Sequence, residues 1–332
     1  MTPEFSCYLV NTNEQGEITA GIAKRSRSEL PDGNVLIRVH YSSLNYKDAM
    51  AATGNRSIAK SFPHIPGIDA AGVVQESTDP RFLPGQRVIA TGHELGVERW
   101  GGWSEWIRVP GDWLVPLPEG LTLEESMIIG TAGFTAAQCV QAIQHQHVTP
   151  QSGPIAVTGA TGGVGSLAVM LLKQLGYQVT AVTGKAEQGD WLKSLGAHEV
   201  VGRELFDDPR RRPLLSAKFA GAVDTVGGGI LTNLCKMISH RGCVACCGVT
   251  AGAELGLTVY PFILRGLTLA GIDSAWCPDD LRASLWKTLA GPWKPKHLHA
   301  AKKCVSLQEV TAQVEQLMAG KNIGRVVIDL TK

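Results

Sequence analysis

Residues 154–165 read Pro-Ile-Ala-Val-Thr-Gly-Ala-Thr-Gly-Gly-Val-Gly. The short apolar run Ile155 to Val157 leads into this glycine-rich turn, and an apolar segment of helical length, Val164 to Leu175, comes after it. Glycines let a backbone approach phosphate groups closely, and the first N–H groups of a helix point toward such groups. A strand, a tight turn and a helix in this order therefore predict a site for a dinucleotide pyrophosphate.

The glycine pattern itself is only a weak signal. Ala160, Gly162 and Gly165 occupy the three small-residue positions of the usual motif, with alanine in the first. The alternative interpretation is a glycine-rich turn that binds nothing. The residues at the end of the next strand distinguish between these interpretations.

That next strand is predicted at Gln178 to Val182, and it ends in Thr183-Gly184-Lys185. An NAD site usually carries Asp or Glu here, which accepts hydrogen bonds from the ribose hydroxyls. The first acid in this chain is Glu187. A hydroxyl, a glycine and a cation suit a 2′-phosphate instead, on which Lys185 would act as a point charge. The sequence therefore favours NADPH over NAD, the alternative being a solvated Lys185.

The bulk properties are those of a soluble globular enzyme. A length of 332 residues predicts about two domains. The net charge of +1 favours neither nucleic acid nor an anionic membrane as a partner. We expect a cytoplasmic protein, because the N-terminus resembles no secretory signal and we expect no apolar run of the roughly 18 residues that a membrane span needs. The basic run Arg210-Arg211-Arg212 is interpreted as a solvated loop, the alternative being a patch that meets a phosphorylated substrate.

Eight cysteines invite a metal interpretation, which the spacing does not favour. Cys243, Cys246 and Cys247 lie in an apolar run that predicts a buried strand. Structural zinc sites pair one C-x-x-C with a second pair of ligands, and this sequence offers none. We predict packing cysteines, without structural zinc and without disulfides.

The first 120 residues alternate short apolar runs with turn residues, which predicts a compact β-barrel-like domain. Its strands are predicted at Val35 to Val39, Ala71 to Val74, Arg87 to Ala90 and Trp106 to Val109. The box Thr122-Leu-Glu-Glu125 predicts a helix start, and Gly133 to Ile143 a long helical segment.

From residue 154 onward strands alternate with helical patterns, as a parallel sheet requires. We predict strands near 155–158, 178–182, 199–201, 221–225, 243–247 and 267–271. Six strands suit a complete doubly wound sheet. The last run, Arg325 to Leu330, is predicted to be a strand that returns to the N-terminal domain.

Several further stretches carry a family resemblance along nearly the whole chain. They are Ser43-Leu-Asn-Tyr-Lys-Asp48, Pro63-His-Ile-Pro-Gly-Ile-Asp-Ala-Ala-Gly72, Gly101-Gly-Trp-Ser-Glu105, Ile128-Ile-Gly-Thr-Ala-Gly-Phe-Thr-Ala136, Asp224-Thr-Val-Gly-Gly228 and Pro261-Phe-Ile-Leu-Arg265. The chain resembles the medium-chain dehydrogenase/reductase superfamily, in its zinc-free quinone-oxidoreductase-like branch, and within it the acrylyl-CoA reductase (NADPH) subgroup. The resemblance implies an α/β protein with a GroES-like β-barrel catalytic domain in 1–125, completed by a return segment in 273–332. It implies a doubly wound (Rossmann) NADPH-binding domain in 126–272.

The positions of the zinc ligands support this branch. Zinc-dependent relatives carry a catalytic Cys where this chain has Tyr46, and a Gly-His-Glu where it has Gly67-Ile68-Asp69. Both substitutions remove metal ligands. A second Gly-His-Glu, Gly92-His93-Glu94, lies in a predicted loop and is interpreted as coincidence. We therefore predict no metal site.

Without zinc, an alcohol dehydrogenase mechanism lacks its Lewis acid, which leaves hydride transfer to an activated C=C bond. Hydride on the β-carbon makes an enolate, which needs a hydrogen-bond donor and a proton source. The catalytic candidates are Tyr46, Asn45 and Asp48. Their respective alternatives are a core aromatic residue, a turn residue and a helix-start or ion-pairing carboxylate.

The resemblance also implies the cofactor contacts. The pyrophosphate would meet Thr161, Gly162, Gly163, Val164 and Gly165, and the 2′-phosphate would meet Thr183, Gly184 and Lys185. Arg203 is a separate candidate, as a second cation on that phosphate. Arg203 has the alternative of being solvated. Tyr46 is a candidate to orient the nicotinamide, and further contacts on that side are expected near Val249, Leu264, Ser274 and, more weakly, Asn322.

Three functions are open from the sequence. The first is reduction of acrylyl-CoA to propionyl-CoA, the second reduction of a quinone or small enone, and the third NADPH binding without catalysis. All three have a small-molecule ligand, and a homodimer joined through the edge run Leu267 to Gly271 is expected from the family. Trp100, Trp103 and Trp106 either wall a substrate channel or pack the barrel edge.

Overall fold

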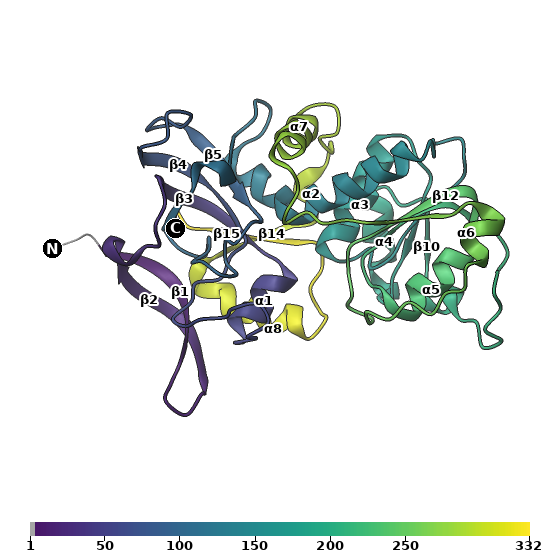
Figure 1. Ribbon diagram of the computed structural model, residues 1–332, viewed down its shortest axis with the longest axis horizontal. Coiled ribbons are helices and arrows are strands. Elements are labelled where there is room, and N and C mark those ends of the chain that lie inside the picture. The colour runs from purple at the N-terminus through teal and green to yellow at the C-terminus, as the bar shows by residue number, and fades with distance from the viewer. Residues whose placement is uncertain (1–3) are drawn as a thin grey trace. The chain divides into compact units, whose positions relative to one another are not determined.

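A computed structural model describes residues 4–332 (Figure 1). Its contacts divide the chain into two compact units. Unit 1 contains the chain up to residue 131 together with 275–290 and 302–332, and unit 2 contains 132–274 and 291–301. The domain boundaries inferred from the sequence, after residues 125 and 272, remain predictions.

The strands are β1 Glu4–Thr12, β2 Ile18–Ser26, β3 Val35–Leu44, β4 Asp69–Ser77, β5 Arg87–Thr91, β6 Trp106–Val109, β7 Leu114–Pro116, β8 Ile155–Val157, β9 Val179–Val182, β10 Glu199–Val201, β11 Phe219–Asp224, β12 Ile238–Cys246, β13 Thr268–Gly271, β14 Lys302–Ser306 and β15 Arg325–Asp329. The α-helices are α1 Tyr46–Ala52, α2 Leu123–His145, α3 Gly163–Gln174, α4 Gly189–Leu195, α5 Gly228–Lys236, α6 Tyr260–Arg265, α7 Asp279–Ala290 and α8 Val310–Met318.

Unit 1 is built on a sheet in the order β14-β15-β3-β4-β5-β7, with β6 paired to β3. The four strands predicted in the first 120 residues are confirmed as β3, β4, β5 and β6. The predicted return of the last strand is also confirmed, because β15 pairs antiparallel with β3. The sequence prediction missed the β1–β2 hairpin, β7 and β14. All side chains of β2 are exposed or half-buried, so its apolar alternation is weak.

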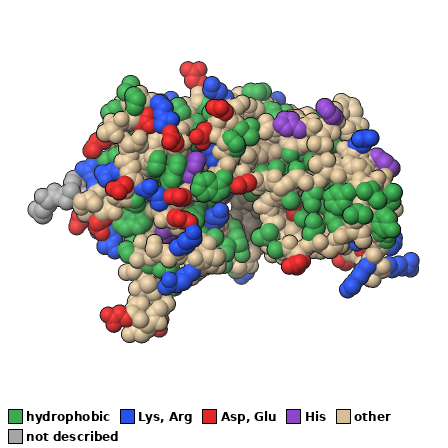
Figure 2. Space-filling model, viewed as in Figure 1, with side chains coloured by type: hydrophobic (Ala, Val, Ile, Leu, Met, Phe, Trp, Pro, Cys, Tyr) green, Lys and Arg blue, Asp and Glu red, His purple; other side chains and the backbone are tan. Residues whose placement is uncertain are grey.

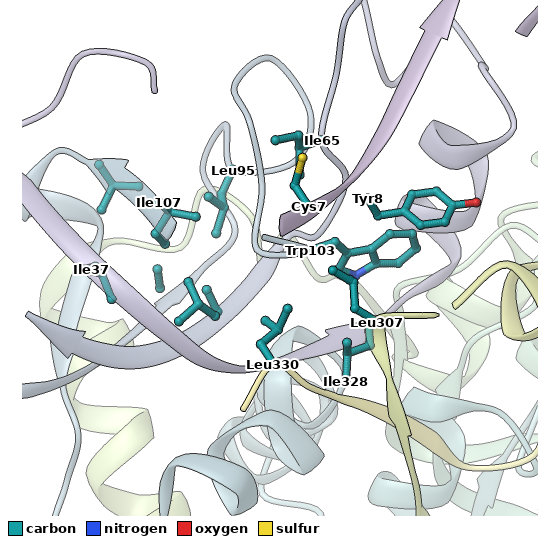
Figure 3. Packing of buried hydrophobic residues seen from close by; sticks show 14 of the residues in the cluster. Cys7, Tyr8, Ile37, Ile65, Leu95, Trp103, Ile107, Leu307, Ile328 and Leu330 are labelled. Atoms are coloured by element: carbon teal, nitrogen blue, oxygen red, sulfur yellow. The ribbon is translucent and has the colours of Figure 1, made fainter. Parts of the chain in front are cut away.

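The core of unit 1 is packed around Trp103, whose side chain is fully buried (Figure 3). The ring of Tyr8 meets the Trp103 indole edge-on, with centroids 5.5 Å apart, and the indole N–H donates to the carbonyl of Ser43 at 2.9 Å. Trp100 and Trp106 are partly buried against the same core. Of the two interpretations of these tryptophans, packing is therefore confirmed for Trp103.

Unit 2 contains a parallel sheet in the order β10-β9-β8-β11-β12-β13. All six predicted strands are present, and the order reverses at β8, where the chain moves to β9 on one side and later to β11 on the other. This is the predicted doubly wound arrangement, and such sheets bind ligands at the carboxyl ends of the strands where the order reverses. Strand β13 forms one edge of the sheet.

Helix α2 begins at the predicted box: Glu125 N–H donates to the Thr122 hydroxyl, and Thr122 N–H donates to the Glu125 carboxylate. Gly130, at φ +48°, kinks the helix. By length and composition α2 could cross a membrane, which corrects the expectation that no run is long enough. Its apolar window is 78% buried inside the protein, which is typical of a core helix.

The cysteines and His93 lie apart from any metal-like arrangement. Within residues 4–332, no group of three or more His, Cys, Asp and Glu side chains could hold a metal ion, and all eight cysteines are free thiols. Cys243 is buried in β12, as a packing residue would be. His93 stacks on Trp113, and burial lowers its pKa to about 4.

Candidate active site

In unit 2, the glycine-rich turn joins β8 to α3 as predicted. Gly159 takes the left-handed conformation at φ +58°, so it is the residue that makes the tight turn. A Cβ atom on Gly165 would lie 2.3 Å from the carbonyl oxygen of Gly159, so only glycine lets α3 start this close to the turn. The first N–H groups of a helix lack partners within the helix, so this end of α3 offers donors to an anionic group. The glycine pattern in the sequence does not predict this role for Gly159.

The turn is held in place by Asp224 at the end of β11. Its buried carboxylate accepts from the Thr158 hydroxyl at 2.7 Å and from the Gly227 N–H at 2.8 Å. Burial raises the pKa of Asp224, with these hydrogen bonds opposing the shift. The motif that begins at Asp224 was noticed in the sequence, but its role as a tie between two strand ends was not.

The second predicted half of the cofactor site lies at the end of β9. The Thr183 hydroxyl accepts from the N–H of Lys185 at 3.0 Å, which bends the chain after the strand. A Cβ atom on Gly184 would lie 2.8 Å from the guanidinium carbon of Arg203, so that cation lies directly over Gly184. Burial lowers the pKa of Lys185, the Glu187 carboxylate opposes this, and Arg203 adds to it. The structure thus brings Arg203 and Lys185 together at one turn.

The remaining cofactor candidates are spread more widely. Val249 and Ser274 follow β12 and β13, at the carboxyl ends of these strands. Ser274 accepts a hydrogen bond from Thr135 at 2.8 Å. Leu264 lies in α6, which precedes β13, so it sits where that strand begins and apart from the other candidates. Asn322, in unit 1, donates to the carbonyl of Gly324 at 3.2 Å.

In unit 1, Asp48 is fully buried and clamps two segments together. One carboxylate oxygen accepts from the backbone N–H of Asn45 at 2.8 Å and from its side-chain amide at 3.1 Å. The other accepts from the N–H groups of Gly67 and Ile68 at 3.1 and 2.8 Å. This carboxylate therefore fixes the start of α1 against the segment that resembles the zinc-ligand motif.

A buried ion pair that no sequence pattern predicts lies next to this clamp. Asp69 and Arg325 approach to 3.7 Å, and both side chains are at most 2% exposed. The Asp69 carboxylate also accepts from the Ser43 hydroxyl and the Asn45 amide, and from the N–H and hydroxyl of Thr131. A Cβ atom on Gly130 would lie 2.5 Å from this carboxylate, so the kink in α2 makes room for the pair.

Asn45 joins the two carboxylates. Its amide nitrogen donates to Asp48 and Asp69, and its amide oxygen accepts from Arg325 at 3.0 Å. These bonds engage both ends of the amide, so Asn45 is held in one orientation and is more than a turn residue. Asp48 is the buried helix-start carboxylate that one interpretation predicted.

Tyr46 differs from its two neighbours because it faces solvent. The residue is 47% exposed, so the alternative of a core aromatic side chain with a satisfied hydroxyl is wrong. Within residues 4–332, the hydroxyl makes no hydrogen bond to another residue, which leaves it available to a ligand. Tyr46 is the first residue of α1, directly after the fixed Asn45.

The pH dependence of stability provides one test of this network. Burial, and then the charge of Asp69, raise the pKa of Asp48 from 3.8 to about 7, against the hydrogen bonds from Asn45 and Ile68. The folded protein thus holds this proton more tightly than the unfolded chain, so its contribution is full below about pH 4 and is lost as the pH rises to about 7. We expect Asp48→Asn to remove this falling slope, measured by urea unfolding at about pH 4.5, 5.5 and 6.5, which are spread evenly through the titration. An unchanged slope would show that Asp48 ionises normally.

Two family models match the chain. One, described as the alcohol dehydrogenase GroES-like domain, matches residues 31–119 of unit 1. The other, described as zinc-binding dehydrogenase, matches residues 163–290.

Individual relatives match nearly the whole chain. "Acrylyl-CoA reductase AcuI" of Ruegeria pomeroyi is 41% identical, covering 98% of this chain and 99% of the relative. "Putative quinone oxidoreductase YhfP" of Bacillus subtilis is 47% identical, covering 95% and 96%. The crystal structure of that Bacillus protein, titled with NAD bound, has a TM-score of 0.96 at 45% identity, covering 99% and 100%. The yhdH oxidoreductase of Salmonella enterica, titled in complex with NADP, has a TM-score of 0.95 at 43% identity, covering 98% and 99%.

Proposed function

Because this chain belongs to the zinc-free branch of the medium-chain dehydrogenase/reductase superfamily, we propose that it reduces an activated C=C bond with NADPH, acrylyl-CoA to propionyl-CoA being the first candidate reaction. The observation that carries the proposal is the buried network where zinc-dependent relatives bind metal. The family resemblance implies that Ile68 stands in the place of the ligating histidine, and Asp69 is paired with Arg325. The resemblance likewise implies that Tyr46 stands in the place of the ligating cysteine, and its exposed side chain offers a hydroxyl instead.

The residues present fit NADPH. Gly162 and Gly163 carry no side chains at the start of α3, so its N–H groups could meet a pyrophosphate, through Thr161 to Gly165. Lys185 and Arg203 place two positive charges beside Gly184, which suits a 2′-phosphate dianion better than free ribose hydroxyls. The proposed contacts on the nicotinamide side remain Val249, Leu264, Ser274 and Asn322. Leu264 has the least support, because it lies before β13 rather than after the end of a strand.

Each of the three unit 1 candidates would have a distinct part in the reaction. NADPH, when bound, supplies the hydride that reaches the β-carbon of the substrate. Tyr46 would donate a hydrogen bond or a proton to the enolate through its free hydroxyl. Asn45 and Asp48 direct their hydrogen bonds to each other and to the buried ion pair, so we propose that they position Tyr46 rather than touch the substrate.

An acceptor comparison tests the proposed reaction directly. NADPH oxidation would be followed by absorbance with acrylyl-CoA, free acrylate and a benzoquinone, at equal concentrations. Fast oxidation with the CoA ester alone is the expected result. Fast oxidation with the quinone would favour the second candidate, quinone or small-enone reduction, which the name of the Bacillus relative suggests. No oxidation with any acceptor would contradict both and favour a protein that only binds NADPH.

Charge reversal at Lys185 tests the cofactor choice. We expect Lys185→Glu to weaken NADPH binding about 10- to 100-fold, because a hydrogen bond between charged groups contributes roughly 1.5–3 kcal/mol. NADH binding should change little, because a carboxylate can accept from free ribose hydroxyls. The measurement is the ratio of NADPH to NADH dissociation constants, with Lys193→Glu in the nearby helix α4 as the matched control. An unchanged ratio would remove Lys185 from the site.

We further propose a cytoplasmic homodimer. Strand β13 has a free edge, and the following exposed apolar side chains lie in the segment between β12 and β13: Val249, Leu255, Val259, Tyr260, Ile263 and Leu264. Figure 2 shows hydrophobic side chains gathered over this region of unit 2. Exposed edges and apolar patches of this kind favour pairing with a second chain. Sedimentation equilibrium would test it, and a monomer at micromolar concentration would contradict it.

A further inference from the structure

A groove that takes no part in the proposed reaction runs along helix α5. Its cavity has a volume of about 680 Å³. Three structural parts line it: the α5 positions Gly229, Thr232, Asn233 and Lys236, the loop positions Asp208, Arg211, Arg212 and Pro213, and the following positions Glu254, Gly256 and Thr258. The α5 positions are spaced by three and four residues, so they form one stripe of the helix. We call this cavity the α5 groove.

The floor of the α5 groove contains a buried charge cluster. The Asp208 side chain is fully buried and accepts from the Arg212 Nε at 3.1 Å, and Lys236 Nζ lies 3.5 Å from it. The Lys236 side chain is 9% exposed. Burial opposes ionisation of Asp208, but the hydrogen bonds from Arg212 and the charges of Arg212 and Lys236 together lower its pKa. The cluster is therefore one carboxylate between two cations.

Arg211 adds a third cation at the rim. Its side chain is exposed and has no hydrogen bond or ion pair within the described residues. Its backbone is left-handed, at φ +48°, a conformation that costs a non-glycine residue roughly 1–2 kcal/mol. With Glu254 counted as a second carboxylate, the groove has three cations and two anions, so it is net positive. Figure 2 shows Lys and Arg side chains at the lower right of the molecule, in the region where Figure 1 labels α5 and α6.

Uncharged donors complete the lining. The Thr232 oxygen accepts from the Gly256 N–H at 3.2 Å, so its own O–H is left to donate. Asn233 donates one N–H to the Phe206 carbonyl and keeps a second N–H. Guanidinium forks and hydroxyls bind phosphate oxygens well, and a cavity of this size suits a ligand larger than an inorganic ion. None of the residues proposed for NADPH lines the groove.

We propose that the α5 groove is a second ligand site of unit 2, which binds the phosphate groups of a small phosphate ester of nucleotide size through Arg211, Arg212 and Lys236. Phosphate oxygens would take the guanidinium N–H groups that Asp208 leaves unused, and the Lys236 ammonium would contact them from the floor. The site is independent of the reaction proposed above, and its test does not use turnover.

The experiment is a calorimetric titration of inorganic pyrophosphate into protein saturated with NADPH, so that the cofactor site is occupied. The wild-type chain should bind one equivalent saturably. Gly229→Phe should abolish this binding, because a Cβ atom there meets no atom within 4 Å and the ring can fill the groove without disturbing the fold. Gly189→Phe is the matched control, since Gly189 is equally open, lies at the start of α4 and does not line the groove.

A second variant removes charge instead of space. In Arg211→Asn the exposed cation is removed, and asparagine tolerates the left-handed backbone at this position. The variant should therefore weaken the binding of pyrophosphate about tenfold or more without lowering the melting temperature. Absence of saturable binding to the wild-type chain would overturn the proposal, and so would unchanged binding in Gly229→Phe. Guanosine 5′-diphosphate, which carries two linked phosphates like pyrophosphate and is no part of coenzyme A, tests for a nucleotide. Tighter binding than pyrophosphate supports a phosphate ester, and binding no tighter than pyrophosphate overturns the ester as the ligand.

Discussion

Replacing Arg325 with methionine is expected to lower the free energy of unfolding of unit 1 by about 3–5 kcal/mol. The variant leaves the Asp69 carboxylate fully buried without its counterion. It also removes the donors that hold the amide oxygen of Asn45 and the carbonyls of Leu44 and Ile128. Removal of one partner of a buried pair is costly because the other charge stays desolvated, whereas removal of both can cost much less.

Denaturant unfolding followed by tryptophan fluorescence measures this loss, because Trp103 and Trp286 are buried in unit 1. The control is Lys60→Met, which breaks the exposed contact with Glu98 in the same unit and should cost less than about 1 kcal/mol. The double variant Arg325→Met with Asp69→Asn should recover part of the loss. A single variant within about 1 kcal/mol of wild type would contradict the assignment of this pair as the anchor of the site.

Tyr46→Phe is expected to lower kcat by about 10²- to 10⁴-fold with the accepted substrate, the range typical of a lost proton donor. The dissociation constant of NADPH should stay within a factor of about two, because the other cofactor contacts proposed above do not involve the Tyr46 hydroxyl. Stability should hardly change, since the hydroxyl has no partner within residues 4–332 and the residue is 47% exposed.

The matched control for this variant is Tyr260→Phe, which removes the hydroxyl of another tyrosine that is 45% exposed and has no proposed catalytic part. Equal activity of Tyr46→Phe and wild type would show that the Tyr46 hydroxyl has no part in the reaction and that only the ring matters. A pH profile of kcat separates the remaining cases, because a proton donor removes or shifts the basic limb when it is deleted, whereas a packing residue lowers the whole profile.

The sequence predicted the architecture well because the features concerned are local. The alternation of strands with helical patterns after residue 154 and the glycine-rich turn both depend on periodicity and turn chemistry within short windows. The box at Thr122 and Glu125 is equally local, and the structure confirms it. Strand β2 escaped prediction because exposed strands give little apolar contrast. Strand β1 is mostly buried, and its apolar run could have indicated it.

The candidate site was only partly predictable. The choice of Asn45, Tyr46 and Asp48 came from one short motif, and the structure distinguishes among them by burial: Asp48 is enclosed, Asn45 is fixed and Tyr46 is exposed. Arg203 is 18 positions beyond Lys185 in the chain, yet its guanidinium lies over Gly184 because β9 and β10 are parallel neighbours. The absence of a side chain at Gly184 makes this approach of Arg203 possible. The reason for a glycine at this position is therefore visible only in the tertiary structure.

The sequence by itself determined the family, the doubly wound sheet and the glycine-rich turn, since each depends on residues that are close along the chain. Only the tertiary structure decided that Asp69 meets Arg325, 256 positions away, beneath a kink at Gly130. It likewise decided that Lys236 and Arg212 enclose Asp208 in the α5 groove. Charges attract through space rather than along the chain, and the partner of a buried charge is fixed only when the strands and helices that carry both are packed together.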